Sequence, residues 1–302
     1  MASDALRITV LGSATPYPRP GNACSGFLVE GGGARVWVDA GTGTLAELQR
    51  YVALGEVDAV WLSHLHADHS ADLLTAYYAL LYADLDLPLP LLGPPGTADR
   101  LAGFLTNGPV RSPVEKAFAV EELYDGHVTR VGGLTLRSRA VEHGGPPAFA
   151  LRVEDGRGCS LVYSGDCEPC PYLVELARDC DLFLCEADGD GPGHHSAAQA
   201  GRSAAGARAR RLVLTHVGPG TEPAEALALA AAEHPGEIAH ADPGLRFVPG
   251  AGRGGMDRGA RAAGRVTRAA RRTRPRRRSR TPGRTTTSPA SSRSAPPPSP
   301  SP

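Results

Sequence analysis

Two periodicities divide the first part of the chain into strands and helices. Short runs of β-branched and apolar residues bounded by glycine predict three strands, at 7–12, 26–31 and 34–41. Apolar residues at helical spacing, ending at a glycine, predict a helix over 44–55. A buried strand over 57–64 and an apolar helix over 71–85 are expected to follow.

A second series of elements begins near residue 133. Its strands are expected near 133–142, 148–154, 159–164, 181–187, 211–217 and 245–249. Its helices are expected near 171–178, 197–208 and 223–233. The chain thus falls into two halves, in each of which strands come first in series and then alternate with helices. This order predicts an α/β fold, a four-layer αββα sandwich.

The segment from Gly250 to the end lacks the apolar side chains of a core. It contains one Val, one Met and no Leu, Ile or aromatic residue, while Arg, Ser, Thr and Pro dominate. Such a segment cannot bury enough apolar surface to offset the entropy lost on ordering. We therefore predict one folded domain over residues 1–249 and a disordered Arg/Pro/Ser-rich tail over 250–302.

The formal net charge of zero conceals an uneven distribution. Residues 250–302 carry fourteen arginines and one aspartate, a net charge of +13, so residues 1–249 carry −13. An acidic domain argues against a broad nucleic-acid surface. A basic tail can contact RNA or an anionic membrane through non-specific charge, but an inert extension or a reading-frame artefact is the interpretation we prefer.

The cysteine pattern and the N-terminal sequence give an expectation for the cellular compartment. Six cysteines are scattered from position 24 to position 185, and the N-terminus lacks the basic and apolar segments of a signal peptide. No stretch approaches the length of a membrane span. We therefore expect free thiols in a reducing cytoplasm. Cys167 and Cys170 form a CxxC pair, but without a second pair two small thiols in a loop are favoured over a zinc or redox role.

The segment "WLSHLHADHS" (61–70) concentrates three of the ten histidines of the chain. A strand leaving the core places alternate side chains on one face, so His64 and His66 are expected to point together toward one metal ion. Asp68 and His69 follow where the next helix begins, and are expected to face a second ion beside the first. The segment therefore predicts half of a metal site.

Later strands supply the remaining ligands. His143, Asp166 and His216 each follow an apolar run, and the active groups of α/β sheets gather at such strand ends. The predicted assignment gives one ion His64, His66 and His143, gives the other Asp68, His69 and His216, and lets Asp166 bridge both. Such sets without thiolate suit two Zn²⁺ ions, and Mn²⁺ or Fe²⁺ also bind them. Three protein ligands and a bridge leave each ion an open position, which marks a catalytic site.

Single histidines carry less information than this run. Alone, His143 or His216 is more often an ordinary core or surface residue than a ligand, and the His-x-His-x-Asp-His run is what favours the dinuclear interpretation. His127, His234 and His240 have no such context, and we expect them at the surface.

The motifs "HLHADH", "EHGGPPAFALR", "YSGDC" and "LVLTH" together resemble the metallo-β-lactamase superfamily, over most of residues 6–248. The resemblance implies an αββα fold with a di-zinc centre, and homodimers are common among such relatives. It also places Asp39 of "VDAG" beneath the metals, where its carboxylate would orient a ligand imidazole. A turn aspartate at a strand end is the alternative for Asp39.

Within the superfamily, the resemblance favours phosphoester chemistry. True β-lactamases of this fold commonly have a cysteine where this chain has Asp166, whereas an aspartate bridge suits two cations that neutralise a phosphodiester. The segment "CEADGDGPGHHSAAQA" is similar to the pattern of ribonuclease Z and related phosphodiesterases, although two positions of its His-Ser-Thr triplet differ. By this resemblance His194, steered by Glu186, protonates the leaving alkoxide. A loop histidine without a role is the alternative, and it is favoured for His195.

Two smaller predictions belong to the same site. Asp68 is expected to accept a proton during catalysis as well as to bind an ion. Ser196 and Gln199 have the spacing of a capping box, which would begin the helix that fixes His194 near the metals.

Ribonuclease Z also carries a long arm that grips the tRNA elbow, inserted between the third-motif histidine and the bridging aspartate. Here His143 and Asp166 are only 23 positions apart, enough for two strands and a turn. We therefore expect a di-zinc phosphodiesterase acting on cyclic nucleotides or another small phosphodiester. A ribonuclease Z-type RNA 3′-processing endonuclease and a thioester or lactone hydrolase are the rival enzymes. A non-catalytic metal- or RNA-binding protein is the third interpretation.

Overall fold

The computed structural model describes residues 4–82, 85, 88–250 and 256–258. All of these residues belong to one compact unit, which spans Met1–Gly264. The predicted tail lies outside the described residues except for Gly250 and residues 256–258. Those three residues form a short strand at the edge of a sheet, so the folded part includes residues beyond the predicted boundary at 249.

The first sheet has the order β16-β15-β1-β3-β4-β5-β6-β7, with β2 paired to β1. Its strands are β1 (Arg7–Ala14), β2 (Ala23–Cys24), β3 (Gly26–Gly31), β4 (Ala34–Val38), β5 (Ala59–Trp61), β6 (Leu89–Gly93), β7 (Phe118–Glu122), β15 (Leu245–Phe247) and β16 (Met256–Arg258). The pairs β1–β3 and β3–β4 are antiparallel, whereas β4, β5, β6 and β7 run parallel.

The second sheet repeats this division, in the order β14-β13-β12-β11-β10-β9-β8. Its strands are β8 (Val128–Val131), β9 (Leu134–Val141), β10 (Ala148–Glu154), β11 (Ser160–Tyr163), β12 (Leu182–Ala187), β13 (Arg211–Val217) and β14 (Glu237–His240). Strands β8 to β11 pair antiparallel, and β11 to β14 run parallel. Parallel neighbours need crossover connections, and these connections carry the helices.

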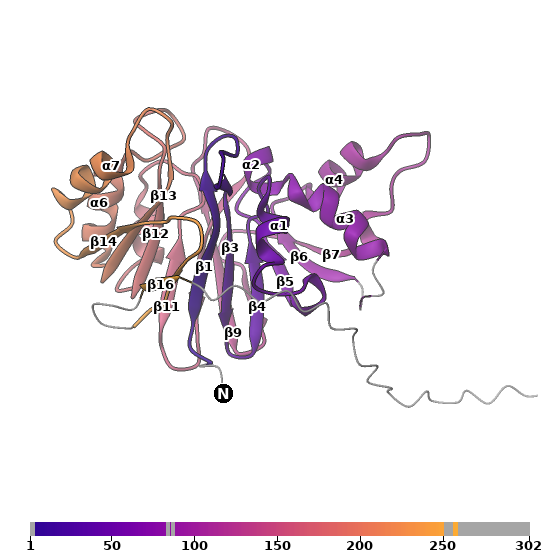
Figure 1. The fold of residues 1–302 in the computed structure, drawn as a ribbon, viewed down its shortest axis with the longest axis horizontal. Helices are drawn as coiled ribbons and strands as arrows, with labels where there is room; N and C mark the ends of the chain where they lie inside the picture. Colours follow the sequence, from indigo (N-terminus) through magenta and orange to yellow (C-terminus); the bar gives the residue numbers. More distant parts are fainter. Residues whose placement is uncertain (1–3, 83–84, 86–87, 251–255, 259–302) are drawn as a thin grey trace, which may run out of the picture. The chain divides into compact units, whose positions relative to one another are not determined.

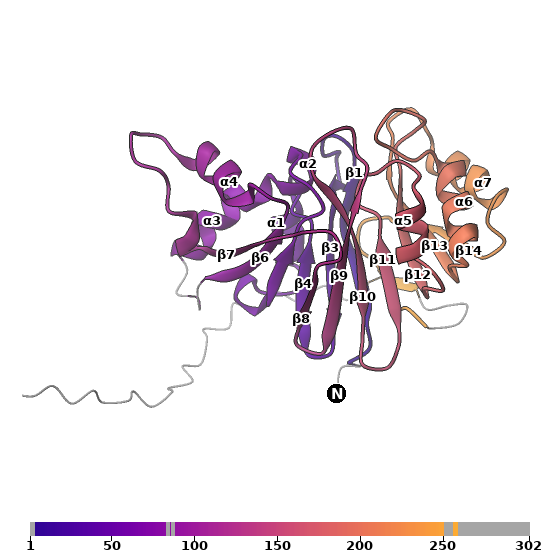
Figure 2. The same cartoon turned by 180° about the vertical axis from the view of Figure 1, so that it is seen from behind.

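Helices cover the outer faces of both sheets (Figures 1 and 2). Beside the first sheet lie α1 (Thr44–Leu48), α2 (Ala67–Ser70), α3 (Asp72–Tyr82) and α4 (Thr97–Leu105), with the 3₁₀ turns η1 (Leu54–Glu56) and η2 (Val114–Lys116). Beside the second lie α5 (Pro171–Leu176), α6 (Ala197–Ala207) and α7 (Pro223–Ala231). The predicted αββα sandwich is confirmed. No helix in the described ranges has both the length and the apolar character needed to cross a membrane.

The two sheets meet across one apolar core. Phe27 of β3 and Tyr163 of β11 contact each other there, with ring centroids 5.1 Å apart. Trp61 of β5 is fully buried, and its indole N–H donates to Ser138 Oγ of β9 at 3.0 Å. Because an unpaired buried N–H costs about 1–3 kcal/mol, this bond lets a large side chain fill the interface without that loss.

Two predicted elements are shorter than expected. The helix predicted over 44–55 ends at Leu48, and the turn η1 then brings Leu54 into the same core as Val52. Apolar residues at helical spacing were therefore packed inward by two short elements in place of one helix. The strand predicted over 57–64 is β5, which ends at Trp61, so His64 and His66 lie in a loop.

Candidate metal centre

The predicted ligands of the "HLHADH" segment lie between β5 and α3. His64 is in the loop after β5, His66 is the residue preceding α2, and Asp68 and His69 are in α2. Figure 1 shows α2 at the upper edge of the sheets. His64 and His66 point together as expected, with 3.0 Å between His64 Nε2 and His66 Nδ1. They do so from a loop, whereas a continuing strand was predicted.

His143 completes the first predicted group. It follows β9, and its Nε2 lies 3.1 Å from His66 Nδ1. Its Nδ1 donates to the carbonyl of Gly193 at 2.7 Å, which leaves the Nε2 lone pair directed at the other two imidazoles. His64, His66 and His143 thus form a cluster able to hold one ion.

Asp68, His69 and His216 form the second predicted group. His216 lies near the end of β13, and its Nε2 is 3.2 Å from His69 Nε2 and 3.3 Å from Asp68 Oδ2. The backbone of His216 is left-handed, with φ of 50°. Such a backbone is uncommon for a residue other than glycine and is found preferentially at functional sites. Here it coincides with an irregularity in the pairing of β12 with β13.

Asp166 lies between the two groups, after β11. Its Oδ2 is 3.3 Å from both His69 Nε2 and His216 Nε2, and 3.9 Å from His64 Nε2. Its Oδ1 is buried without a hydrogen-bond partner among the described residues. A buried carboxylate oxygen without a donor is costly, and a cation would satisfy it. This is the position that the predicted bridging role requires.

A hydrogen-bonded network behind the cluster fixes the orientation of two imidazoles. Asp39 Oδ2 accepts from His69 Nδ1 at 2.8 Å and from the hydroxyl of Ser63 at 2.8 Å. Because the Ser63 proton goes to Asp39, the Ser63 oxygen accepts from His64 Nδ1, 3.0 Å away. Both Nδ1 atoms therefore donate outward and both Nε2 lone pairs face the cluster.

Asp39 is itself held rigidly. It is fully buried, its Oδ1 accepts from the backbone N–H of Ser63 at 2.8 Å, and its Oδ2 also accepts from the hydroxyl of Tyr163 at 2.8 Å. The predicted contact between Asp39 and a ligand imidazole is present. Ser63 and Tyr163 were not predicted, because single hydroxyl residues next to apolar runs give no signal in the sequence.

Burial and opposite charge act together on the cluster. Burial lowers the pKa of His64 well below its ordinary value. Burial by itself would raise the pKa of Asp166, but His216 and His69 outweigh it and hold that pKa well below the usual range. Burial likewise opposes protonation of His69, but Asp166 and Asp39 outweigh it and raise the pKa of His69 well above 6.5. A divalent ion entering the cluster would therefore displace a proton from His69.

The geometry fits divalent ions. Tetrahedral ligands about 2.0–2.1 Å from a zinc ion lie about 3.4 Å from one another. The contacting donor atoms of the two groups are mostly 3.0–3.3 Å apart, and most belong to buried side chains. Such short approaches between lone pairs are repulsive unless a proton or a cation lies between them. All seven predicted ligands lie close together here, and two of the five overlapping groups able to hold an ion are the predicted ones; which ligands bind which ion stays a prediction.

His194 lies beside the cluster, in the segment before α6. Its Nδ1 is 3.1 Å and 3.2 Å from the two carboxylate oxygens of Glu186, which is fully buried in β12. This hydrogen bond raises the pKa of His194 to about 9, and burial raises that of Glu186. Glu186 accepts in addition from the backbone N–H of Cys167 at 2.7 Å. The carboxylate is therefore fixed, and it holds the His194 ring toward the cluster.

His195 has a different environment from that of His194. Its ring is fully buried, with Nδ1 donating to the Cys167 carbonyl at 2.6 Å and Nε2 3.1 Å from the hydroxyl of Ser203. Burial lowers the pKa of His195 to about 4. Both ring nitrogens have partners, so His195 links the segment before α6 to the loop after Asp166 by hydrogen bonds.

Of the other sequence predictions, two are confirmed and two are wrong. The capping box is present, with Ser196 N donating to Gln199 Oε1 at 2.8 Å at the start of α6. All six cysteines are free thiols, as expected. The surface positions predicted for His127 and His234 are wrong, because both are about 4% exposed. Asp188, which was not predicted, lies 4.0 Å from both His194 Nε2 and His216 Nδ1.

Comparison with known proteins agrees with this geometry. Residues 13–217 match the family model described as beta-lactamase superfamily domain. An uncharacterized protein of Mycobacterium leprae is 38% identical over 246 residues, which cover 77% of this chain and 85% of that protein. The ribonuclease Z of Mycobacterium avium is 31% identical over 254 residues, covering 71% and 86% respectively.

A solved structure shares the same architecture. The metallo-beta-lactamase fold protein YhfI from Bacillus subtilis superposes with a TM-score of 0.72 at 26% identity, covering 80% of this chain and 99% of YhfI. The clustered histidines and aspartates, the two sheets with their outer helices and the matched family model all point the same way. The chain belongs to the beta-lactamase superfamily and is a metal-dependent hydrolase of that superfamily.

Proposed function

We propose that this hydrolase is a phosphodiesterase that acts on cyclic nucleotides or similarly small phosphodiesters with two zinc ions. The observation that supports it most is the convergence of imidazole nitrogens and carboxylate oxygens on both sides of Asp166. His64, His66 and His143 would hold one ion, and Asp68, His69 and His216 the other. Two such ions neutralise a phosphodiester and activate water for attack on phosphorus.

In the proposal, side chains beside the ions carry out the proton transfers. Asp68 has one carboxylate oxygen 3.3 Å from His216, and in the proposal it also accepts a proton from the attacking water. His194 donates a proton to the leaving oxygen through Nε2, because Glu186 occupies its Nδ1. Glu186 is a positioning residue in this account. Proton transfer of this kind contributes about 10²–10⁴-fold in rate.

The segment between His143 and Asp166 favours a small substrate. It consists of β10 and β11, joined by the turn in which Cys159 N–H donates to Asp155 at 3.0 Å. With the turn between them, the two strands span residues 148–163, which is most of the segment, and no long arm is inserted there. A substrate held without an arm has to be recognised mainly at the site itself.

The alternative with a specific observation in its favour is ribonuclease Z-type processing of RNA 3′ ends. Ribonuclease Z of Mycobacterium avium matches this chain over most of its length. Both activities break a phosphodiester, so the same seven ligands serve either one. The size of the substrate is what separates them.

The test is a substrate panel with zinc-loaded full-length protein and its Asp166→Ala variant. The panel contains 3′,5′-cyclic AMP, a precursor tRNA with a 3′ trailer, and a thioester and a lactone. We expect turnover of cyclic AMP that disappears in the variant. Faster cleavage of the precursor tRNA would replace the proposal by the alternative, and turnover of only the carbon-centred esters would contradict phosphodiester chemistry.

A further inference from the structure

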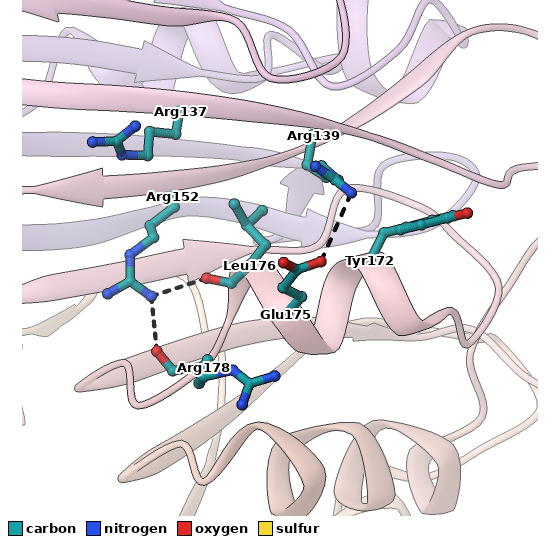
Figure 3. Close-up of a pocket in the computed structure, with 7 residues that line it drawn as sticks. All are labelled: Arg137, Arg139, Arg152, Tyr172, Glu175, Leu176 and Arg178. Carbon is teal, nitrogen blue, oxygen red and sulfur yellow. Dashed lines mark hydrogen bonds and ion pairs between the residues drawn. The ribbon is translucent and has the colours of Figure 1, made fainter.

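A second polar site lies on the outer face of the second sheet. It is a hollow of about 320 Å³ between β9, β10 and α5, which we call the arginine hollow (Figure 3). Four of its lining residues are arginines: Arg137, Arg139, Arg152 and Arg178. None of the predicted metal ligands lines it. The hollow is therefore a separate site, whose chemistry the hydrolysis of a phosphodiester does not use.

The sheet places two of these arginines directly opposite each other. Arg137 of β9 and Arg152 of β10 are register partners in the antiparallel pair. Like charges in this position are destabilising. One carboxylate, that of Glu154, contacts both guanidinium groups, at 3.7 Å from Arg137 and 2.9 Å from Arg152. One carboxylate is thus the shared acidic partner of two guanidinium groups.

Of the remaining two arginines, Arg139 has two acidic partners and only Arg178 adds to the excess. Arg139, two residues beyond Arg137 on the same face of β9, is 3.5 Å from Asp125 and 3.8 Å from Glu175. Arg178 follows α5 and is exposed, and its acidic chain neighbour Asp179, whose pKa it helps to lower, forms its ion pair with Arg208. Four arginines therefore meet three carboxylates, those of Asp125, Glu154 and Glu175, and the hollow keeps one positive charge that they do not neutralise.

Arg152 is held in place before any ligand arrives. One of its nitrogens, Nη1, donates to the carbonyls of Leu176 and Arg178 at 2.9 and 3.1 Å, at the end of α5 (Figure 3). Its side chain is only 17% exposed. A guanidinium fixed in this way loses little conformational freedom when it binds an anion. This distinguishes the hollow from a set of mobile surface charges.

The other end of the hollow is aromatic. The ring of Tyr172, on the first turn of α5, is half exposed, and the guanidinium carbon of Arg139 lies 5.1 Å from its centroid. Leu176, one turn further along α5, lies between this ring and the arginines at the opposite end (Figure 3). The lining thus passes from cationic to apolar to aromatic, and the ion pair of Arg139 with Glu175 lies at the aromatic end (Figure 3).

We propose that the arginine hollow binds a nucleoside phosphate. The phosphate groups lie among Arg137, Arg152 and Arg178, because guanidinium groups match phosphate oxygens in charge and geometry. The sugar lies over Leu176, and the base stacks on Tyr172, as bases do on exposed aromatic rings. The volume is at the lower end of the roughly 300–1,000 Å³ of small-molecule sites. The ligand is bound here and not cleaved.

The first test compares ATP binding by calorimetry in three forms of the full-length protein. The Arg137→Gln/Arg178→Gln variant removes two charges, of which that of Arg137 has its acidic partner Glu154 at 3.7 Å. Arg152 is left in place because it holds the end of α5. The Arg50→Gln/Arg202→Gln variant is the control, since it removes two other exposed charges that each have one acidic partner.

We expect the hollow variant to bind ATP at least about tenfold more weakly than the wild type and the control to bind within about twofold of it. Any binding of ATP at the metal centre is common to the three forms and drops out of the comparison. Equal affinity in the hollow variant and the control would overturn the proposal.

A second test addresses the nucleoside end. Tyr172→Leu should weaken ATP binding about fivefold or more and leave tripolyphosphate binding unchanged, while Tyr172→Phe should match the wild type for both. Equal losses for ATP and tripolyphosphate in Tyr172→Leu would contradict base stacking. A short single-stranded RNA that binds more tightly than ATP, with the same dependence on Arg137 and Arg178, would make the hollow part of a nucleic-acid surface and overturn the proposal.

Discussion

The metal centre and the arginine hollow are two polar clusters with opposite chemistry. In the metal centre, nitrogens and oxygens of mostly buried side chains approach one another to 3.0–3.3 Å. In the hollow, partly exposed guanidinium groups present only N–H donors. One cluster is completed by a cation and the other by an anion. The type of atom that converges, and not the amount of polar surface, sets the charge of the ligand.

The contacts that orient the side chains also differ between the metal centre and the arginine hollow. Behind the metal centre, Asp39 accepts from His69 and from Ser63, and Ser63 accepts from His64. The Nδ1 atoms of His64 and His69 are therefore donors, and their Nε2 lone pairs face the cluster. In the hollow, the carbonyls of Leu176 and Arg178 accept from Arg152. Both devices orient a side chain before a ligand binds, but only the first selects which atom is free to bind a metal.

Removal of Asp166 is the change with the largest expected effect. Asp166→Ala deletes the carboxylate that lies between the two groups of ligands, so metal content and cyclic AMP turnover should both fall to background. ATP affinity at the arginine hollow should stay unchanged. Metal analysis, a turnover assay and calorimetry on the same preparation check this. A variant that keeps both ions and its turnover would show that Asp166 is not a shared ligand.

Removal of His194 should separate rate from metal binding. His194→Ala leaves the seven predicted ligands intact, so we expect the metal content of the wild type and a turnover number lower by about 10²–10⁴-fold. His240→Ala serves as the control, because His240 belongs to none of the groups of described residues that could hold an ion and pairs with Asp242. Loss of metal in His194→Ala would make His194 a ligand and contradict its proposed role.

Asp39 offers a smaller effect on metal affinity. Asp39→Asn keeps the shape of the side chain but removes the charge that orients His69, so we expect metal affinity to fall about 10–100-fold. Competition with a chelator of known affinity measures it. Unchanged affinity would mean that the network behind His69 only fills space.

The low pKa of His195 predicts that the stability of the protein depends on pH, whereas the arginines of the hollow add no such dependence. Its pKa is about 4 in the folded protein against 6.5 unfolded, so the unfolded chain binds more protons between these values. Stability from His195 is therefore complete above about pH 6.5 and is lost as the pH falls toward 4, by up to about 3 kcal/mol. Arginines stay charged throughout, so the hollow adds no such slope.

Denaturant unfolding of chelator-treated protein at pH 7 and pH 5 checks this prediction. His195→Asn keeps a donor for the Cys167 carbonyl and should lose less stability between the two pH values than the wild type does. An equal loss in both proteins would contradict the low pKa of His195.

The sequence predicted the fold wherever its periodicity was clear. Strands β3 and β10 have the predicted bounds, because glycines or a hairpin turn delimit them. No element was predicted over 86–132, where the structure has β6, α4, η2, β7 and β8. Pro90 lies inside β6 and half of β8 is exposed, so neither strand shows a regular alternation of apolar and polar residues.

The two sites differed in how far the sequence revealed them. The metal ligands were predictable because His64, His66, Asp68 and His69 fall within six consecutive positions and the others follow apolar runs. Ser63 and Tyr163 act through hydrogen bonds that only the fold creates. The arginine hollow gave no signal, because its residues are spread from 137 to 178 and only strand pairing and α5 bring them together.

The most direct test of the metal centre is the number of ions bound per chain. Full-length protein is saturated with zinc, freed of excess ions and analysed for metal and protein by mass spectrometry. Two ions per chain, falling in Asp166→Ala, is the predicted result. One ion or none per wild-type chain would contradict the assignment of His64, His66 and His143 to one ion and of Asp68, His69 and His216 to another.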